Sequence, residues 1–183
     1  MRALALLALL LAPAVSGCIV ESRLRADGGG TLRLQYRLDE KTTLGTVVQR
    51  LESPSVVVRS ARIDHDRVAT FTLQFADASA LSRTQFFKNL SVTRAPGGEP
   101  GTTDWVAKVV QPKPVQIPDK LLEYYGRELK VTVTFPGPVI ATNATSHEGA
   151  TASWAIPLQT ALSSAETVFT ATWKNREVPS APG

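Results

Sequence analysis

Cys18 is the only cysteine in this chain of 183 residues. It follows a short apolar run at the N-terminus, which is typical of an exported protein. Exported domains often contain disulfides, but a single cysteine forms none within its own chain. The fold of the remaining residues must therefore be held together by its buried core alone.

The residues just before Cys18 match a lipobox, with Val-Ser-Gly-Cys at residues 15–18. Arg2 precedes the apolar run Ala3–Ala12, which is shorter than the roughly 20 residues that a membrane-spanning helix needs. This pattern predicts a lipoprotein signal peptide at residues 1–17, and it resembles a bacterial lipoprotein precursor. Small residues before the cleaved bond admit a peptidase, and the Cys18 thiol is the nucleophile that would carry a diacylglycerol. The alternative, an ordinary signal peptide before an unrelated cysteine, explains neither the spacing nor the flanking residue types.

Length and charge limit the classes of protein that this chain can belong to. We expect residues 18–174 to form one domain and the Pro-containing residues 175–183 to be disordered. The chain has 20 basic and 16 acidic residues, a net charge of +4 that is too small to indicate a nucleic-acid partner. Because Ile19 already begins an alternating pattern, the fold is expected to start at the membrane, without a flexible tether.

Alternation of apolar and polar residues predicts strands along most of the domain. The first two, at 20–26 and 32–38, are expected to form a hairpin through the glycines at 28–30. We expect the register that places Ala26 opposite Leu32 and Leu24 opposite Leu34. Further strands are predicted near 56–63, 69–75, 90–94, 105–110, 129–135, 139–143, 150–156 and 166–174.

The strand at 56–63 leaves two orientations open, with either Val56 and Val58 or Val57, Ala61 and Ile63 facing the core. Helices are predicted at 40–51, capped by Asp39, at 77–81 and after Pro118. The predicted class is α+β, with a mostly antiparallel, curved or barrel-like sheet and two or three short helices.

Three segments carry a resemblance to a known family: Asp27-Gly28-Gly29-Gly30-Thr31, then residues 135–143 (Phe-Pro-Gly-Pro-Val-Ile-Ala-Thr-Asn), then residues 149–154 (Gly-Ala-Thr-Ala-Ser-Trp). In this order after the lipobox, they resemble an LppM-type bacterial lipoprotein domain from Cys18 to about Trp173. The resemblance implies an α+β envelope protein that handles lipid or apolar ligands, and it brings no catalytic residues. Members commonly carry a C-terminal membrane helix. No such segment is found up to Gly183, so lipid is the expected anchor.

The same segments also have a purely structural interpretation. Gly137 relaxes the backbone between two prolines, Asn143 tolerates a turn, and Trp154 is expected in the core.

No motif for catalysis, a metal or a cofactor is found in the sequence. His65 and His147 both lie in predicted turns beside carboxylates, but a zinc site needs three or four convergent ligands. Ser146, His147 and Glu148 are adjacent in sequence, whereas a hydrolase triad converges from distant segments. We therefore expect a protein that is not an enzyme and that uses no cofactor.

The outward face of the first hairpin is predicted to carry a stripe of arginines, with Arg25 opposite Arg33. Being close to Cys18, this stripe would lie within reach of anionic lipid headgroups. The other interpretation is an ordinary solvated face of a half-exposed sheet. The four arginines of the stripe are Arg23, Arg25, Arg33 and Arg37.

Two functions remain open after these observations. The first is binding of a lipid or other apolar envelope component in a pocket. The second is a structural or adaptor role, in which an exposed apolar patch docks another envelope protein. In either case the protein is expected in the cell envelope, and in the outer membrane of a two-membrane cell because Ile19 is not aspartate. The expected pocket residues are Phe71, Phe75, Leu122, Tyr125 and Phe169.

Acylation is tested by changing Cys18 to alanine. We expect the wild-type chain to take up an alkynyl fatty acid during growth and Cys18→Ala to take up none, because the thiol is the attachment point. The variant should also accumulate as an uncleaved or soluble form. Equal labelling of the two chains would exclude Cys18 as the site.

Overall fold

The computed structural model describes residues 17–175 and arranges their strands in two sheets. The predicted signal peptide and C-terminal tail lie outside the described residues, apart from Gly17 and Asn175. The elements are β1 (Gly17–Leu24), β2 (Gly30–Arg37), α1 (Leu44–Leu51), β3 (Val56–Ile63), β4 (Val68–Phe75), the 3-10 helix η1 (Ala78–Arg83), β5 (Leu90–Pro96), β6 (Thr102–Val110), α2 (Asp119–Tyr125), β7 (Glu128–Thr134), β8 (Val139–Thr142), β9 (Ser146–Glu148), β10 (Thr151–Pro157), α3 (Leu158–Ser163) and β11 (Glu166–Lys174).

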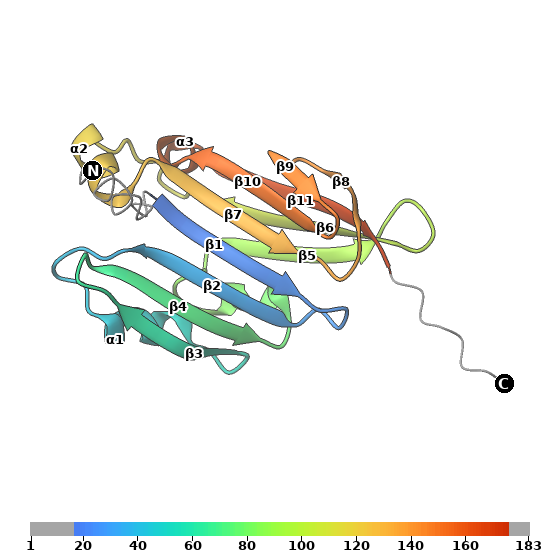
Figure 1. Cartoon of the computed structure of the whole chain (residues 1–183), viewed down its shortest axis with the longest axis horizontal. Coiled ribbons are helices and arrows are strands. Elements are labelled where there is room, and N and C mark those ends of the chain that lie inside the picture. Colours follow the sequence, from blue (N-terminus) through green and yellow to red (C-terminus); the bar gives the residue numbers. More distant parts are fainter. Residues whose placement is uncertain (1–16, 176–183) are drawn as a thin grey trace, which may run out of the picture.

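The predicted α+β class is confirmed, and the strands divide between two sheets. One sheet has seven strands in the order β3-β4-β2-β1-β7-β10-β9, and the other has four in the order β5-β6-β11-β8. Among the described strands, β1 and β7 alone pair in parallel. Figure 1 shows the four-stranded sheet behind β7 and β10, with α1 behind β3 and β4.

One apolar core joins the two sheets, α1 and η1. Its largest members form a chain of aromatic contacts between the layers. Trp105 of β6 meets Phe135 with ring centroids 5.4 Å apart and Trp154 at 6.2 Å, while Phe135 stacks on Trp173 at 5.1 Å. Such pairs add to the stabilisation from area burial alone, which matters in a domain without a disulfide.

The predicted hairpin forms, but its predicted register is wrong. Leu24 lies opposite Gly30, and Ser22 lies opposite Leu32. The turn has the predicted length but lies two residues earlier in the chain, because Arg25 N–H donates to Gly29 O at 2.8 Å and the Asp27 carboxylate accepts from Gly29 N–H at 2.9 Å. The slip from the predicted register is an even number of residues, so each side chain stays on its predicted face.

One further prediction is corrected by local hydrogen bonding, and one open alternative is settled by a register shift. The helix starts at Leu44, after an N-cap at Thr43, because the Asp39 carboxylate instead accepts from Lys41 N–H and Thr42 N–H. In β3 a register shift between Val58 and Ser60 changes which residues face inward.

The register shift shows that each of the two possible orientations of β3 is correct for one part of the strand. Val56 and Val58 face the same side as Ala61 and Ile63, because the bulge lies between the two pairs. The structure also contains α3 and β9, which the periodicity does not predict.

Trp154 provides a direct test of this core. Its side chain is 4% exposed, its indole N–H donates to Asn143 Oδ1 at 2.8 Å, and its ring meets that of Phe169 edge-on. We expect Trp154→Ala to lower the free energy of unfolding by about 3–5 kcal/mol, measured by chemical denaturation. Ser153→Ala, on the outer face of the same strand, is the control. An unchanged unfolding midpoint for Trp154→Ala would contradict the packing.

Candidate functional site

Cys18 lies in the second position of β1, a strand bonded on both sides, to β2 and to β7. Alternate side chains of a strand point to the same face. Cys18 therefore shares the inner face with Val20, Ser22 and Leu24. The thiol is half-buried, and this burial raises the pKa of Cys18 above its ordinary value. Its neighbour across the parallel pairing is Leu129 of β7.

A cavity of about 320 Å³ lies between the two sheets, next to this inner face. Almost all of its lining is apolar, with the few polar groups supplied by Ser22, Asn89, Gln111 and the Trp105 indole. The lining residues are Val20, Ser22, Leu24, Leu32, Phe75, Ala78, Leu81, Phe86, Phe87, Asn89, Leu90, Val92, Trp105, Ala107, Val109, Gln111, Leu129, Val131, Val133 and Phe169.

The cavity opens toward the end of the molecule where β1 begins. Along β7 the lining side chains pass from buried Val133 to half-buried Leu129. On β6 they pass from buried Trp105 to half-buried Val109, which precedes exposed Val110. Both strands have their more exposed lining at the end near Cys18, so the mouth lies there.

Trp105 marks the inner end of the cavity. Its side chain is 6% exposed, and its indole N–H is a buried donor with no acceptor within residues 17–175. An unmatched buried donor costs about 1–3 kcal/mol, so a buried N–H normally has a partner in the protein, an ordered water or a ligand. An oxygen atom of a ligand that reaches the indole N–H would satisfy this donor.

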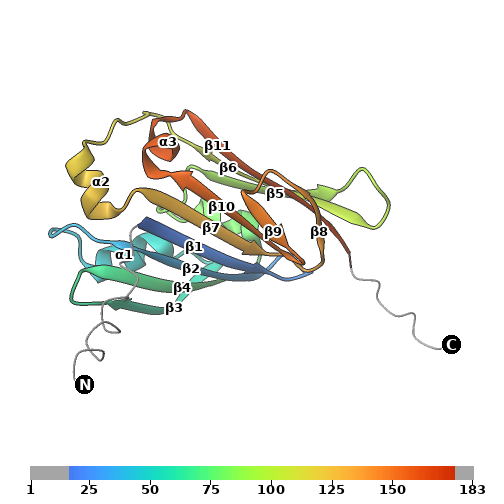
Figure 2. The same ribbon diagram turned by 45° about the horizontal axis from the view of Figure 1, so that its top comes forward.

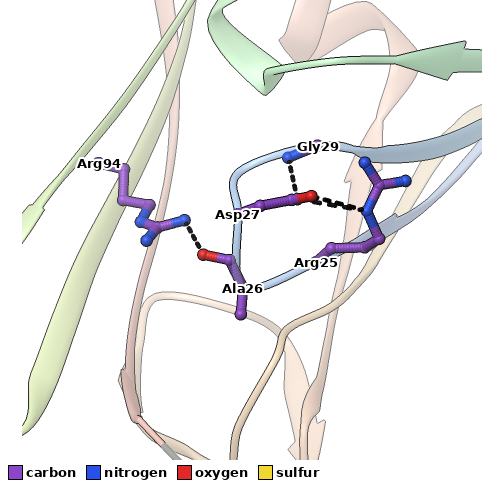
Figure 3. Close-up of polar contacts among 5 residues, drawn as sticks. All are labelled: Arg25, Ala26, Asp27, Gly29 and Arg94. Atoms are coloured by element: carbon purple, nitrogen blue, oxygen red, sulfur yellow. Dashed lines mark hydrogen bonds and ion pairs between the residues drawn. The ribbon is translucent and has the colours of Figure 1, made fainter.

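Beyond Trp105, a second hollow of about 310 Å³ lies at the opposite end, beside the tip of the first hairpin. It has a more polar lining, which includes Arg25, Asp77 and Arg94. Arg94 of β5 reaches across from the four-stranded sheet and donates to Ala26 O at 2.8 Å, while Arg25 pairs with Asp27 (Figure 3). These contacts tie the hairpin tip to the facing sheet.

The four predicted arginines do not form the continuous stripe that the sequence suggests. Arg33 lies opposite Glu21 and forms an ion pair with it at 2.9 Å, rather than facing Arg25. Arg37 donates to Tyr124 O at 3.1 Å and stands over the Tyr124 ring.

Arg23 lies opposite Thr31, and its side chain makes no hydrogen bond or ion pair within the described part of the chain. Three of the four arginines thus have partners in the protein itself. Headgroup binding by this face stays a prediction, with fewer available cations than the sequence indicates.

The five predicted pocket residues are only partly brought together. Phe75 and Phe169 line the cavity. Phe71 is fully buried beside Tyr36 in the core, and Leu122 and Tyr125 lie on α2, so none of these three lines it. Half of the missed lining residues come from β1, β6 and β7. The sequence shows the alternation within these strands, but it does not show which strands face one another across the two sheets.

Neither histidine belongs to a cluster of ligating side chains. His65 is exposed in the β3–β4 turn with Nε2 3.2 Å from Asp66, and His147 is exposed on β9. Within residues 17–175, no group of three or more His, Cys, Asp or Glu side chains is arranged to hold a metal ion. No helix in this range is long and apolar enough to cross a bilayer.

Comparison with known proteins agrees with this architecture. The NMR structure of the folded domain of LppM from Mycobacterium tuberculosis aligns with 88% of this chain and 91% of its own length, with a TM-score of 0.54 and 15% sequence identity. The chain has an LppM-type fold. No family model matches the sequence, and no curated protein does. The LppM likeness therefore rests on the arrangement of strands, and it confirms the fold that the three motifs predicted.

The half-buried Cys18 thiol gives a prediction for the unlipidated chain, made in a cell-free system. Because a raised pKa leaves less thiolate at a given pH, iodoacetamide should alkylate Cys18 more slowly at pH 8 in the folded chain than in urea. The difference should narrow as the pH rises and the folded thiol ionises. Equal rates at pH 8 would contradict the burial.

Proposed function

We propose that this protein is a lipid-anchored envelope protein that binds the hydrocarbon part of a lipid, or another apolar envelope component, in the cavity between its two sheets. The single observation that carries the proposal is the almost wholly apolar lining of a cavity of about 320 Å³. Ligand pockets span about 300–1,000 Å³, so this one suits a single hydrocarbon chain better than a whole diacyl lipid. Each methylene transferred from water would contribute about 0.8 kcal/mol.

The polar groups of the cavity support an amphiphile rather than a pure hydrocarbon. The unmatched Trp105 indole N–H would donate a hydrogen bond to one oxygen atom of the ligand at the inner end of the cavity. Asn89 and Gln111 supply amides near the mouth. Binding requires no bond to form or break, and we propose a role without catalysis or cofactor.

The anchor and the location belong to the same proposal. We infer that a lipid on Cys18 holds the domain at a membrane of the cell envelope, the outer one where there are two. The lipobox supports this inference. The LppM-type fold is consistent with it, because the sequence resembles an LppM-type bacterial lipoprotein domain and the solved LppM domain shares this fold.

An adaptor role is the second candidate, and one observation favours it. Strand β3 is an edge of the seven-stranded sheet, and it exposes Val57 by 42% and Ile63 by 39%. An exposed apolar edge can accept a strand from another envelope protein. Variants at these two positions would impair docking without affecting the cavity.

The lipid-binding proposal is tested by filling the cavity. Native mass spectrometry of the full chain, purified in detergent from a bacterial host, should reveal a co-purified lipid mass on the wild type. Ala107→Phe places a ring in the cavity and should abolish that mass, while Val106→Phe, on the outward face of the same strand, should retain it.

A thermal unfolding measurement is the control that checks whether the Ala107→Phe variant remains folded. Val109→Phe, at the half-buried mouth, is a second variant with less risk to the core. A wild type that carries no lipid, or an Ala107→Phe variant that carries as much as the wild type, would contradict the proposal.

A further inference from the structure

Exposed apolar side chains gather on one segment of the described chain. Of the six large apolar residues that are exposed, Val110, Val115 and Leu121 lie on the connection from β6 into α2, with exposures of 44%, 51% and 44%. The other three are Val57, Ile63 and Ile140, on β3 and β8. Contiguous exposed apolar patches often mark an interaction site, so a segment with three such side chains is a candidate for one.

The segment 110–121 lies at the end of the molecule where β1 begins. Gln111 N–H donates to Ala165 O at 2.8 Å, and Val115 N–H donates to Leu162 O at 2.9 Å, which ties the segment to α3 and the residues that follow it. Both views place α2 and α3 beside the start of β1 (Figures 1 and 2). This is also the end where the cavity opens.

The segment is held in place rather than loosely exposed. Gln159 of α3 accepts from Ile117 N–H at 3.0 Å and donates to Val115 O at 3.2 Å. Three prolines, at 112, 114 and 118, lack a backbone N–H that would need a partner. Several backbone polar groups of this segment are therefore satisfied or absent, which lowers the cost of moving it out of water.

Two further observations identify what covers this end. Cys18, the expected site of the lipid, is the second residue of β1, so its acyl chains would attach at this same end. The segment carries two lysines, Lys113 and Lys120, against one acidic residue, Asp119. Lysines beside apolar residues suit an anionic membrane, where the stem is buried and the ammonium reaches the headgroups.

We propose that segment 110–121 inserts shallowly into the lipid bilayer, with the sheets standing end-on and the cavity mouth facing the acyl chains. A hydrocarbon chain then enters the cavity directly from the membrane, and this entry route rests on the proposed function. The orientation differs from one in which the outer face of β1 and β2, with its arginines, lies on the headgroups.

Fluorescence quenching tests the orientation in the full-length lipidated protein reconstituted into phosphatidylcholine and phosphatidylglycerol vesicles with brominated acyl chains. Val115→Trp is introduced on a Trp105→Phe background, so that lipid in the cavity does not contribute through Trp105. Brominated lipid should lower the emission of the added tryptophan at least about twofold, because a shallowly inserted side chain reaches the acyl boundary.

Val57→Trp is the matched control, since it makes the same substitution at a similarly exposed valine far from this end. Thr31→Trp reports on the arginine face, where Thr31 lies opposite Arg23. Both should be quenched no more than the background. Absence of extra quenching in Val115→Trp, or equal or stronger quenching in Thr31→Trp or Val57→Trp, would overturn the end-on orientation.

The two proposals fail separately. If Val115→Trp is quenched but the wild type carries no lipid by mass spectrometry, the membrane contact holds and the cavity has another role, so the entry route falls. If lipid is retained but Val115→Trp is unquenched, the cavity binds lipid and the end-on contact is wrong. Val115→Asp with Leu121→Asp should reduce quenching at a tryptophan placed at Val110, while the mass of bound lipid in detergent stays unchanged.

Discussion

The parallel pairing of β1 with β7 is the constraint on which the rest of the structure depends. It joins the N-terminal antiparallel strands to the second half of the chain and makes β1 a central strand of the seven-stranded sheet. Because β1 is fixed on both edges, its inner face must lie over the second sheet. Cys18, Val20 and Leu24 consequently share one surface, and the start of the fold coincides with the mouth of the cavity.

Prediction from the sequence succeeded where a signal is local and failed where two arrangements share the same pattern. The bounds of β3 were predicted correctly, since turn residues flank an apolar run. The hairpin register was not, because a shift by an even number of residues leaves Leu24 and Leu32 on the same face and alternation cannot detect it. The pairing of β1 with β7 joins segments about a hundred residues apart in the chain, and nothing local specifies it. For this reason Phe75 and Phe169 could be assigned to a pocket, but Leu129, Val131 and the β6 side chains could not.

The space between the sheets is divided between packing and cavity. On the side of Phe135 and Trp173, stacked and edge-on rings fill it and supply the stability of a domain that has no disulfide within its described residues. On the side of Val20 and Val131, smaller side chains leave the cavity. Trp105 lies at the boundary, because it contacts the aromatic rings and also lines both hollows. A cavity costs packing energy, so its persistence beside a close-packed aromatic cluster is more consistent with a binding role than with imperfect packing.

The closeness of the lipobox cysteine to the first strand gives the proposed orientation its physical basis. A long flexible linker would let a domain tumble above the bilayer, whereas the proposed attachment at the second residue of a central strand would fix which end meets the lipid. At that end Val110, Val115 and Leu121 are exposed, and the cavity opens between half-buried side chains. A hydrocarbon chain that passes from the bilayer into this opening need not cross water, so the penalty of about 0.8 kcal/mol per exposed methylene does not arise along the route. Anchor, apolar segment and cavity would thus act together because one strand places them at the same end.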